Sequence, residues 1–122
     1  MQGFCIMNST ETQFWIIIDR LVAACAVVID RPTGSAHPRF PDMIYPLDYG
    51  YLEGTLASDG GGIDVWLGSS GARDVTGMIV TVALDSRESE NKILLGCTQA
   101  EADTIVQFLS EETFGCYVVW RP

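Results

Sequence analysis

The sequence has little positive charge. Its 122 residues include 7 lysines and arginines, with Lys92 as the only lysine, against 16 aspartates and glutamates, so the formal net charge is −9. Nucleic acids and anionic membranes attract proteins through clustered lysines and arginines. Neither is therefore expected as the main partner. A barrel that binds single-stranded nucleic acid would suit the aromatic residues, but the charge disfavours it.

Long apolar runs and clustered cysteines are also missing. The longest uninterrupted apolar run, 21–29, has nine residues, whereas a membrane-spanning helix needs about 20. The N-terminus lacks the basic and apolar regions of a secretory signal, so a cytoplasmic location is expected. No C-x-x-C pair occurs, which disfavours zinc and redox centres. We interpret the four cysteines as buried thiols: Cys5, Cys25, Cys97 and Cys116.

The composition suits one folded domain. Hydrophobic residues make up 48% of the chain, which is enough for a core at this length. We expect a single domain over 1–122, and the sequence leaves open a disordered leader over 1–8.

Local patterns predict two helices and several short strands. Capping boxes at Thr10 with Gln13 and at Thr98 with Glu101 predict helices over 10–24 and 98–109. Four prolines predict a long loop or loose hairpin over 31–46. Short strands at regular spacing favour a small barrel or sandwich. The expected strands are 25–29, 47–52, 63–67, 78–84, 91–96 and 117–120.

Two acidic segments suggest a binding site. Asp59 and Asp64 flank a triple-glycine turn, which lets the backbone bend so that both carboxylates converge. Asp85 ends one expected strand, and Glu90 and Lys92 open the next on the same face. An ordinary glycine turn and a polar hairpin tip would look similar.

Taken together, these carboxylates indicate a site for a hard cation. Magnesium prefers carboxylate oxygens and water, often with substrate phosphate, and needs neither histidine nor cysteine. Bound cations would let an acidic pocket attract phosphate. Lys92 could then contact a phosphate oxygen.

The order of the motifs resembles one family. Tyr45-Pro46-Leu47-Asp48-Tyr49-Gly50-Tyr51, then Asp59-Gly60-Gly61-Gly62-Ile63-Asp64-Val65, resemble the Y-P-x-N-Y-G-Y and D-G-D-P-x-D-V motifs of soluble family I inorganic pyrophosphatases. Asp85, Glu90 and Lys92 match the family's D-x4-D-x-K spacing, with Glu90 in place of the second Asp. The segment 29–34 resembles the family's strand and turn with a phosphate-binding lysine, here Arg31.

The resemblance implies both fold and activity. The expected fold is α+β, a small closed antiparallel OB-like barrel of about five strands flanked by two helices. The expected activity is Mg²⁺-dependent hydrolysis of pyrophosphate to two phosphates by a metal-bridging water. Family members are often oligomeric, which leaves a homo-oligomer open.

The resemblance also assigns roles to individual residues. The implied metal ligands are Asp59, Asp64, Asp85 and Glu90. The implied phosphate-binding residues are Arg31, Arg39, Tyr49 and Lys92. Asp64, Lys92 and Tyr49 are the implied catalytic residues. His37, the only histidine, is interpreted as an exposed loop residue.

The sequence also departs from the family pattern. The middle Asp of D-G-D-P-x-D, which helps to activate the attacking water, is Gly61 here. The family's C-terminal Tyr-Lys phosphate pair has no counterpart, because 108–112 reads Phe-Leu-Ser-Glu-Glu. The alternative is therefore a weak or inactive pyrophosphatase-like protein that binds a phosphate-containing ligand through Mg²⁺.

Overall fold

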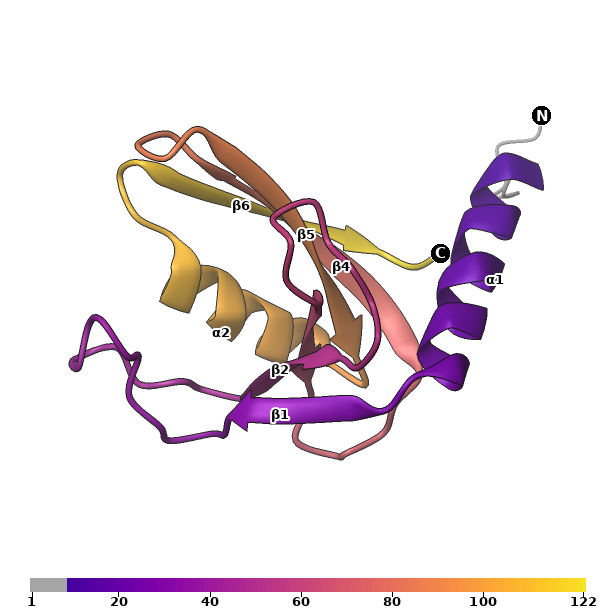
Figure 1. Cartoon of the computed structure of the whole chain (residues 1–122), viewed down its shortest axis with the longest axis horizontal. Coiled ribbons are helices and arrows are strands. Elements are labelled where there is room, and N and C mark those ends of the chain that lie inside the picture. The colour runs from indigo at the N-terminus through magenta and orange to yellow at the C-terminus, as the bar shows by residue number, and fades with distance from the viewer. Residues whose placement is uncertain (1–8) are drawn as a thin grey trace.

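The computed structural model describes residues 9–122. The leader considered over 1–8 and Cys5 lie outside these residues. The helices are α1 (Ser9–Ala24) and α2 (Gln99–Leu109), and the strands are β1 (Val27–Arg31), β2 (Asp48–Leu52), β3 (Ile63–Leu67), β4 (Val75–Ala83), β5 (Glu88–Leu95) and β6 (Phe114–Trp120) (Figure 1). Both predicted helices are confirmed, and the capping box of Thr98 with Glu101 begins α2. The capping box predicted at Thr10 is wrong, because α1 already includes Ser9 and Thr10. Within 9–122, neither helix is long and apolar enough to cross a membrane.

The six strands form an open mixed sheet in the order β1-β2-β3-β5-β4-β6. The prediction of a closed antiparallel barrel is therefore wrong. Closure requires the two edge strands to pair, but β1 pairs only with β2 and β6 only with β4 among the described strands. The pairing is also not purely antiparallel, because β5 lies between β4 and β3 and runs parallel to β3. Strand patterns in the sequence specify which face a side chain takes, not which strand lies next to it.

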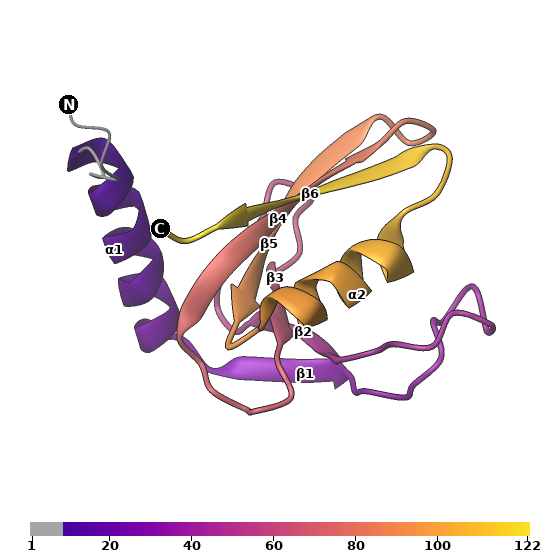
Figure 2. The same ribbon diagram turned by 180° about the vertical axis from the view of Figure 1, so that it is seen from behind.

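The two helices cover opposite faces of the sheet. Side chains alternate along a strand, so Val65 packs with Trp15, Ile18 and Val22 of α1 in one cluster. Its neighbour Trp66 belongs to a second cluster with residues of α2, including Ala102 and Ile105. Figure 2, the view from behind, shows α2 running beside β6, with α1 at the far side of the sheet.

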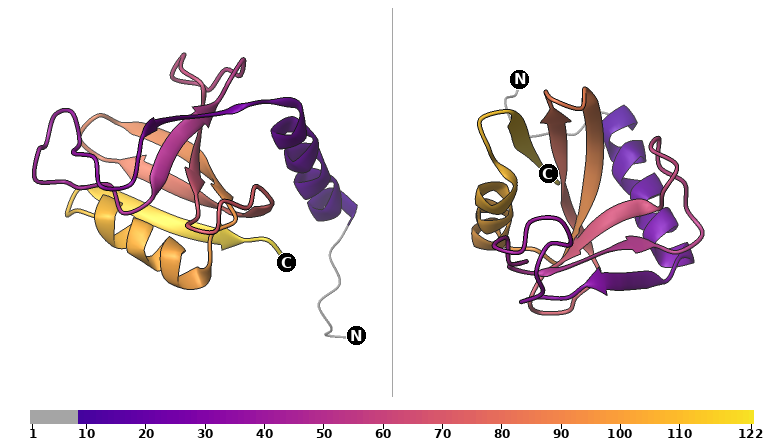
Figure 3. Two further views of the ribbon diagram at one scale, coloured as in Figure 1. Left: turned by 90° about the horizontal axis from the view of Figure 1, so that it is seen from below. Right: turned by 60° about the vertical axis from the view of Figure 1, so that its left-hand side comes forward.

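The long loop between β1 and β2 forms a loose hairpin, as predicted. Backbone hydrogen bonds join Gly34 to Tyr45 and His37 to Met43, and Ala36 and Ile44 form an isolated bridge. The hairpin projects from the end of the molecule opposite α1 (Figure 3). The β1–β2 hairpin therefore lies beside the face of the sheet that α2 covers.

A bidentate ion pair connects α1 to the end of the chain. The guanidinium of Arg121 donates to the Asp19 carboxylate at 2.6 and 2.7 Å. It also lies 5.7 Å from the ring centre of Trp15. This contact holds α1 beside the segment that follows β6.

Candidate active site

Strand register brings four predicted residues to one face of the sheet. The parallel pairing of β3 and β5 begins at Val65 with Ile93. The preceding residues, Asp64 and Lys92, therefore both point toward the α2 face. Tyr49 on β2 lies opposite Trp66 of β3 and opposite Arg31 of β1.

Lys92 is the centre of this group. Its side chain is buried, and its Nζ donates to Tyr49 Oη at 2.9 Å and to Asp64 Oδ2 at 3.1 Å. The Glu90 carboxylate lies 3.5 Å from the same nitrogen. A buried ammonium group is tolerated when it is paired and hydrogen-bonded. The neighbouring tyrosine and carboxylates therefore hold the only lysine in place.

Three of the predicted metal ligands line the same cavity, Asp59, Asp64 and Glu90, and so do the carboxylates of Asp30 and Glu111. Burial raises the pKa of the Glu90 carboxyl, and Asp59 and Asp64 add to this rise while Lys92 opposes it. The hydrogen bond from the Gly61 backbone lowers the pKa of Asp59. The site thus concentrates negative charge that a cation would relieve.

The carboxylates of the cavity suit magnesium when phosphate and water complete its coordination. Among residues 9–122, no group of three or more metal-ligating side chains is close enough to hold an ion. Asp64 and Glu90 both pair with Lys92 instead. Magnesium, however, is often bound through one or two carboxylates together with substrate phosphates and water. The carboxylates of Asp64 and Glu90 fit this mode of binding, in which phosphate and water supply the remaining ligands.

Arg31 and Tyr49 extend the site toward the loop. The Arg31 guanidinium donates to Tyr45 Oη and lies 5.8 Å from the Tyr49 ring centre. Burial, assisted by Asp64, raises the pKa of Tyr49 well above its ordinary value. Tyr49 therefore keeps its phenolic proton at physiological pH.

Two predicted residues lie apart from this group. Asp85 occupies the tip of the β4–β5 hairpin, because Ala83 pairs with Glu88 and leaves 84–87 as the turn. Its carboxylate accepts a hydrogen bond from Thr113 at 3.0 Å. Arg39 lies in the exposed loop, 5.9 Å from the ring centre of Phe40. Neither lines the cavity that contains the other predicted residues.

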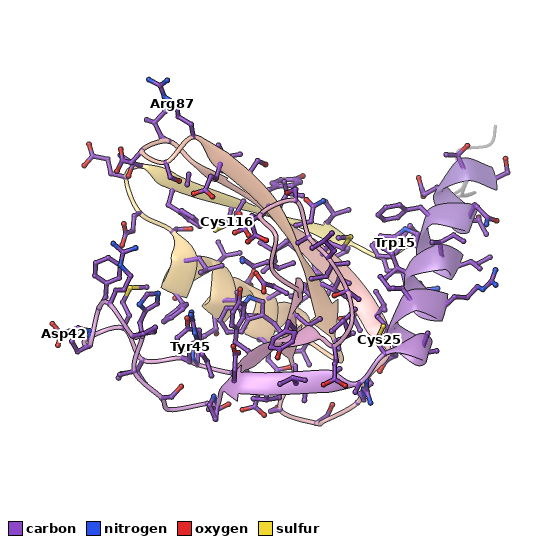
Figure 4. The ribbon with its side chains drawn as sticks, viewed as in Figure 1. Trp15, Cys25, Asp42, Tyr45, Arg87 and Cys116 are labelled. Carbon is purple, nitrogen blue, oxygen red and sulfur yellow. The ribbon has the colours of Figure 1, made fainter. Side chains whose placement is uncertain are left out.

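The cavity measures about 480 Å³ and has an aromatic part that sequence reasoning missed. Trp66 was predictable from strand alternation, since it follows Asp64 by two residues on β3. Tyr45 belongs to a recognised motif and lies within the loop between β1 and β2, as Figure 4 shows. The other apolar and aromatic lining residues depend on tertiary packing: His37, Phe40, Met43, Phe108, Leu109 and Phe114. The buried Trp66 Nε1 has no hydrogen-bond partner among residues 9–122.

No protein-family model and no curated protein sequence matches the chain. Solved structures do match it. An inorganic pyrophosphatase from Neisseria gonorrhoeae has a TM-score of 0.61 at 20% identity, over 78% of this chain and 81% of that one. One from Coxiella burnetii has a TM-score of 0.57 at 18% identity, over 77% and 83%. One from Helicobacter pylori has a TM-score of 0.53 at 17% identity, over 77% and 81%. The resemblance predicted from the motifs is confirmed for the fold, which is pyrophosphatase-like.

Proposed function

We propose that the protein hydrolyses inorganic pyrophosphate to two phosphates in a Mg²⁺-dependent reaction. The observation that carries the proposal is the contact of Lys92 with both Tyr49 and Asp64, beside Glu90 and Asp59. The pyrophosphatase-like fold supports this reaction class, and the motif spacing supports the assignment of individual residues.

Arg31 and Lys92 are the phosphate-binding cations in this proposal. Arg31 offers a fork of N–H donors and Lys92 a compact charge. Tyr49 remains protonated, so its hydroxyl can donate to a phosphate oxygen. Such fixed donors stabilise the anionic transition state, and each is worth about 10²-fold or more in rate.

Asp64 and Glu90 would hold magnesium, with Asp59 at the edge of the same site. The bound ion would lower the pKa of a water molecule and neutralise phosphate charge. Once phosphate enters, Lys92 can exchange part of its pairing with Asp64 and Glu90 for phosphate oxygens. Asp85 and Arg39 do not line the cavity. A metal-ligand role for Asp85 and a phosphate-binding role for Arg39 therefore stay predictions.

The alternative is a protein that binds a phosphate-containing ligand without turnover. Two departures favour it: Gly61 replaces the family's water-activating Asp, and Phe108, Leu109 and Glu111 line the cavity where the Tyr-Lys pair is missing. A positioned base is worth about 10²- to 10⁴-fold. Slow turnover is therefore expected even if the main proposal is correct.

The test is phosphate release from pyrophosphate by the purified chain, with and without magnesium. Asp64→Asn and Lys92→Ala should abolish release, whereas Arg87→Ala at the exposed hairpin tip should leave it unchanged (Figure 4). Circular dichroism establishes that each variant is folded. Magnesium-dependent pyrophosphate binding in calorimetry without release would support the alternative. If the protein neither binds pyrophosphate nor releases phosphate from it, both proposals are overturned.

A further inference from the structure

The cavity has a charged end and an aromatic end, joined by a continuous row of side chains. Lys92 contacts Tyr49, and the Tyr49 ring centre lies 5.7 Å from that of Tyr45. Tyr45 in turn lies 4.9 Å from Phe108 and 6.1 Å from His37, with which it is stacked. The row therefore runs from the phosphate-binding lysine to the space between the loop and α2.

The aromatic end has an exposed ring on the loop. Phe40 is 54% exposed although it lines the cavity, and its ring centre lies 5.2 Å from that of His37. Burial and the nearby Arg31 and Arg39 lower the pKa of His37. His37 is therefore a neutral ring at physiological pH, suited to stacking rather than to phosphate binding.

Charge is distributed unequally between the two ends. Arg31 and Lys92 are the permanent cations among the described lining residues, and both contact or face Tyr49. On the α2 side, Glu111 lines the cavity. Its carboxylate disfavours a phosphate there but can accept hydrogen bonds from sugar hydroxyls. Pyrophosphate alone would occupy the charged end and leave the aromatic end unused.

The volume agrees with a larger ligand. A cavity of about 480 Å³ is within the range of sites that enclose an organic molecule of moderate size. Trp66 also lines the cavity, and its ring centre lies 5.9 Å from that of Phe108, so it adds a further aromatic ring to this end. Flat heterocyclic bases stack on aromatic side chains.

We propose that the site takes a nucleoside diphosphate, with its phosphates at Arg31 and Lys92 and its base between Phe40 and Phe108. This inference rests on the proposed function and extends its substrates from pyrophosphate to nucleoside diphosphates. Water adds to the β-phosphorus, the bond from that phosphorus to the bridging oxygen breaks, and the bridging oxygen leaves with the α-phosphate. The water gives up a proton to solvent, and the products are a nucleoside monophosphate and phosphate.

The experiment compares ligands of equal phosphate number by calorimetry with magnesium. ADP should bind about 5- to 150-fold more tightly than methyl diphosphate, the factor that corresponds to about 1–3 kcal/mol of base stacking on an aromatic side chain. Phe40→Ala should remove most of that difference. Tyr117→Ala is the matched control, since Tyr117 is 73% exposed on β6, outside the cavity. AMP and phosphate release from ADP is measured in parallel.

The outcomes separate the two proposals. Equal affinity for ADP and methyl diphosphate, or an unchanged ADP affinity in Phe40→Ala, would overturn the nucleotide inference. Pyrophosphate hydrolysis in the same preparation would then leave the proposed function standing. If pyrophosphate is neither bound nor hydrolysed, the proposed function fails, and tight, Phe40-dependent ADP binding would retain only a nucleotide-binding role.

Discussion

The ammonium group of Lys92 lies 3.1 Å from the carboxylate of Asp64, although 27 residues separate them in the sequence. The contact depends on the parallel pairing of β3 with β5, which starts one residue after each of them. It places the proposed phosphate-binding cation directly beside a proposed metal ligand.

Tyr49→Phe tests whether the phenolic proton contributes to hydrolysis. The variant keeps the ring that packs on Trp66, at 4.7 Å between ring centres, but loses the hydroxyl that contacts Lys92. We expect about 10²-fold slower turnover with little change in fold. Steady-state phosphate release measures it. Tyr51→Phe on the same strand is the control, because Tyr51 does not line the cavity, and equal rates in the two variants would contradict the role of Tyr49.

Gly61→Asp tests whether a missing base limits the rate. A Cβ at this position would lie 3.4 Å from Asp59 Oδ1, an ordinary contact, so the fold should accept the new carboxylate beside the site. If proton transfer to a base is rate-limiting, turnover should rise by about 10²- to 10⁴-fold. Gly61→Asn has nearly the same size without the charge. An equal rise in both variants would show that the gain does not come from a base.

The Asp19–Arg121 pair should stabilise the protein in a pH-dependent way. Hydrogen bonding to Arg121 lowers the pKa of Asp19 below its unfolded value. The contribution is therefore fully present above the unfolded pKa of about 4 and is lost as pH falls through the lower folded pKa. The Asp19 side chain is 42% exposed, so solvent screening limits the effect of Asp19→Asn to about 0.5–1 kcal/mol.

Urea unfolding at neutral and acidic pH measures this prediction. The stability difference between the natural protein and Asp19→Asn should shrink toward zero between about pH 5 and pH 2. Asp103→Asn serves as the control, because Asp103 is exposed on α2. A difference that grows at acidic pH would contradict the assigned direction.

Cys97 should be chemically inert in the folded protein. Its side chain is 4% exposed, and burial raises the pKa of its thiol to about 12. Since the thiolate is the reactive form, iodoacetamide at pH 8 should label Cys97 only after unfolding. Peptide mass spectrometry measures labelling with and without guanidinium. Rapid labelling of Cys97 in the native protein would contradict the packing around it.

Gly50→Ala should strongly destabilise the fold. A Cβ at Gly50 would lie 1.8 Å from the Val28 carbonyl oxygen, so β1 and β2 could not keep their pairing. We expect a loss of about 3 kcal/mol or more, measured by thermal or urea unfolding. Gly115→Ala is the matched control, because a Cβ at Gly115 would have no contact within 4 Å among the described residues apart from its chain neighbours. If the two variants are equally stable, the backbone of Gly50 does not lie as close to the Val28 carbonyl oxygen as the structure has it.

Local signals were enough to predict the elements and part of the site. The capping box at Thr98 predicted the start of α2, and the prolines predicted the loop before β2. The motif spacing identified Arg31, Tyr49, Asp59, Asp64, Glu90 and Lys92, all of which line one cavity. These signals work because they depend on neighbouring residues or on a chain pattern shared with the pyrophosphatase-like fold.

The sequence by itself determined the acidic charge, the single lysine, the helices and the alternation of side chains along each strand. Only the tertiary structure decided that the sheet stays open, that β5 pairs with β3, and that Asp85 lies at the hairpin tip. Strand neighbours and hairpin register depend on long-range pairing, which alternation along a strand does not encode. For the same reason, Phe40 and Phe108 could be recognised as two sides of one cavity only after the loop and α2 were packed together.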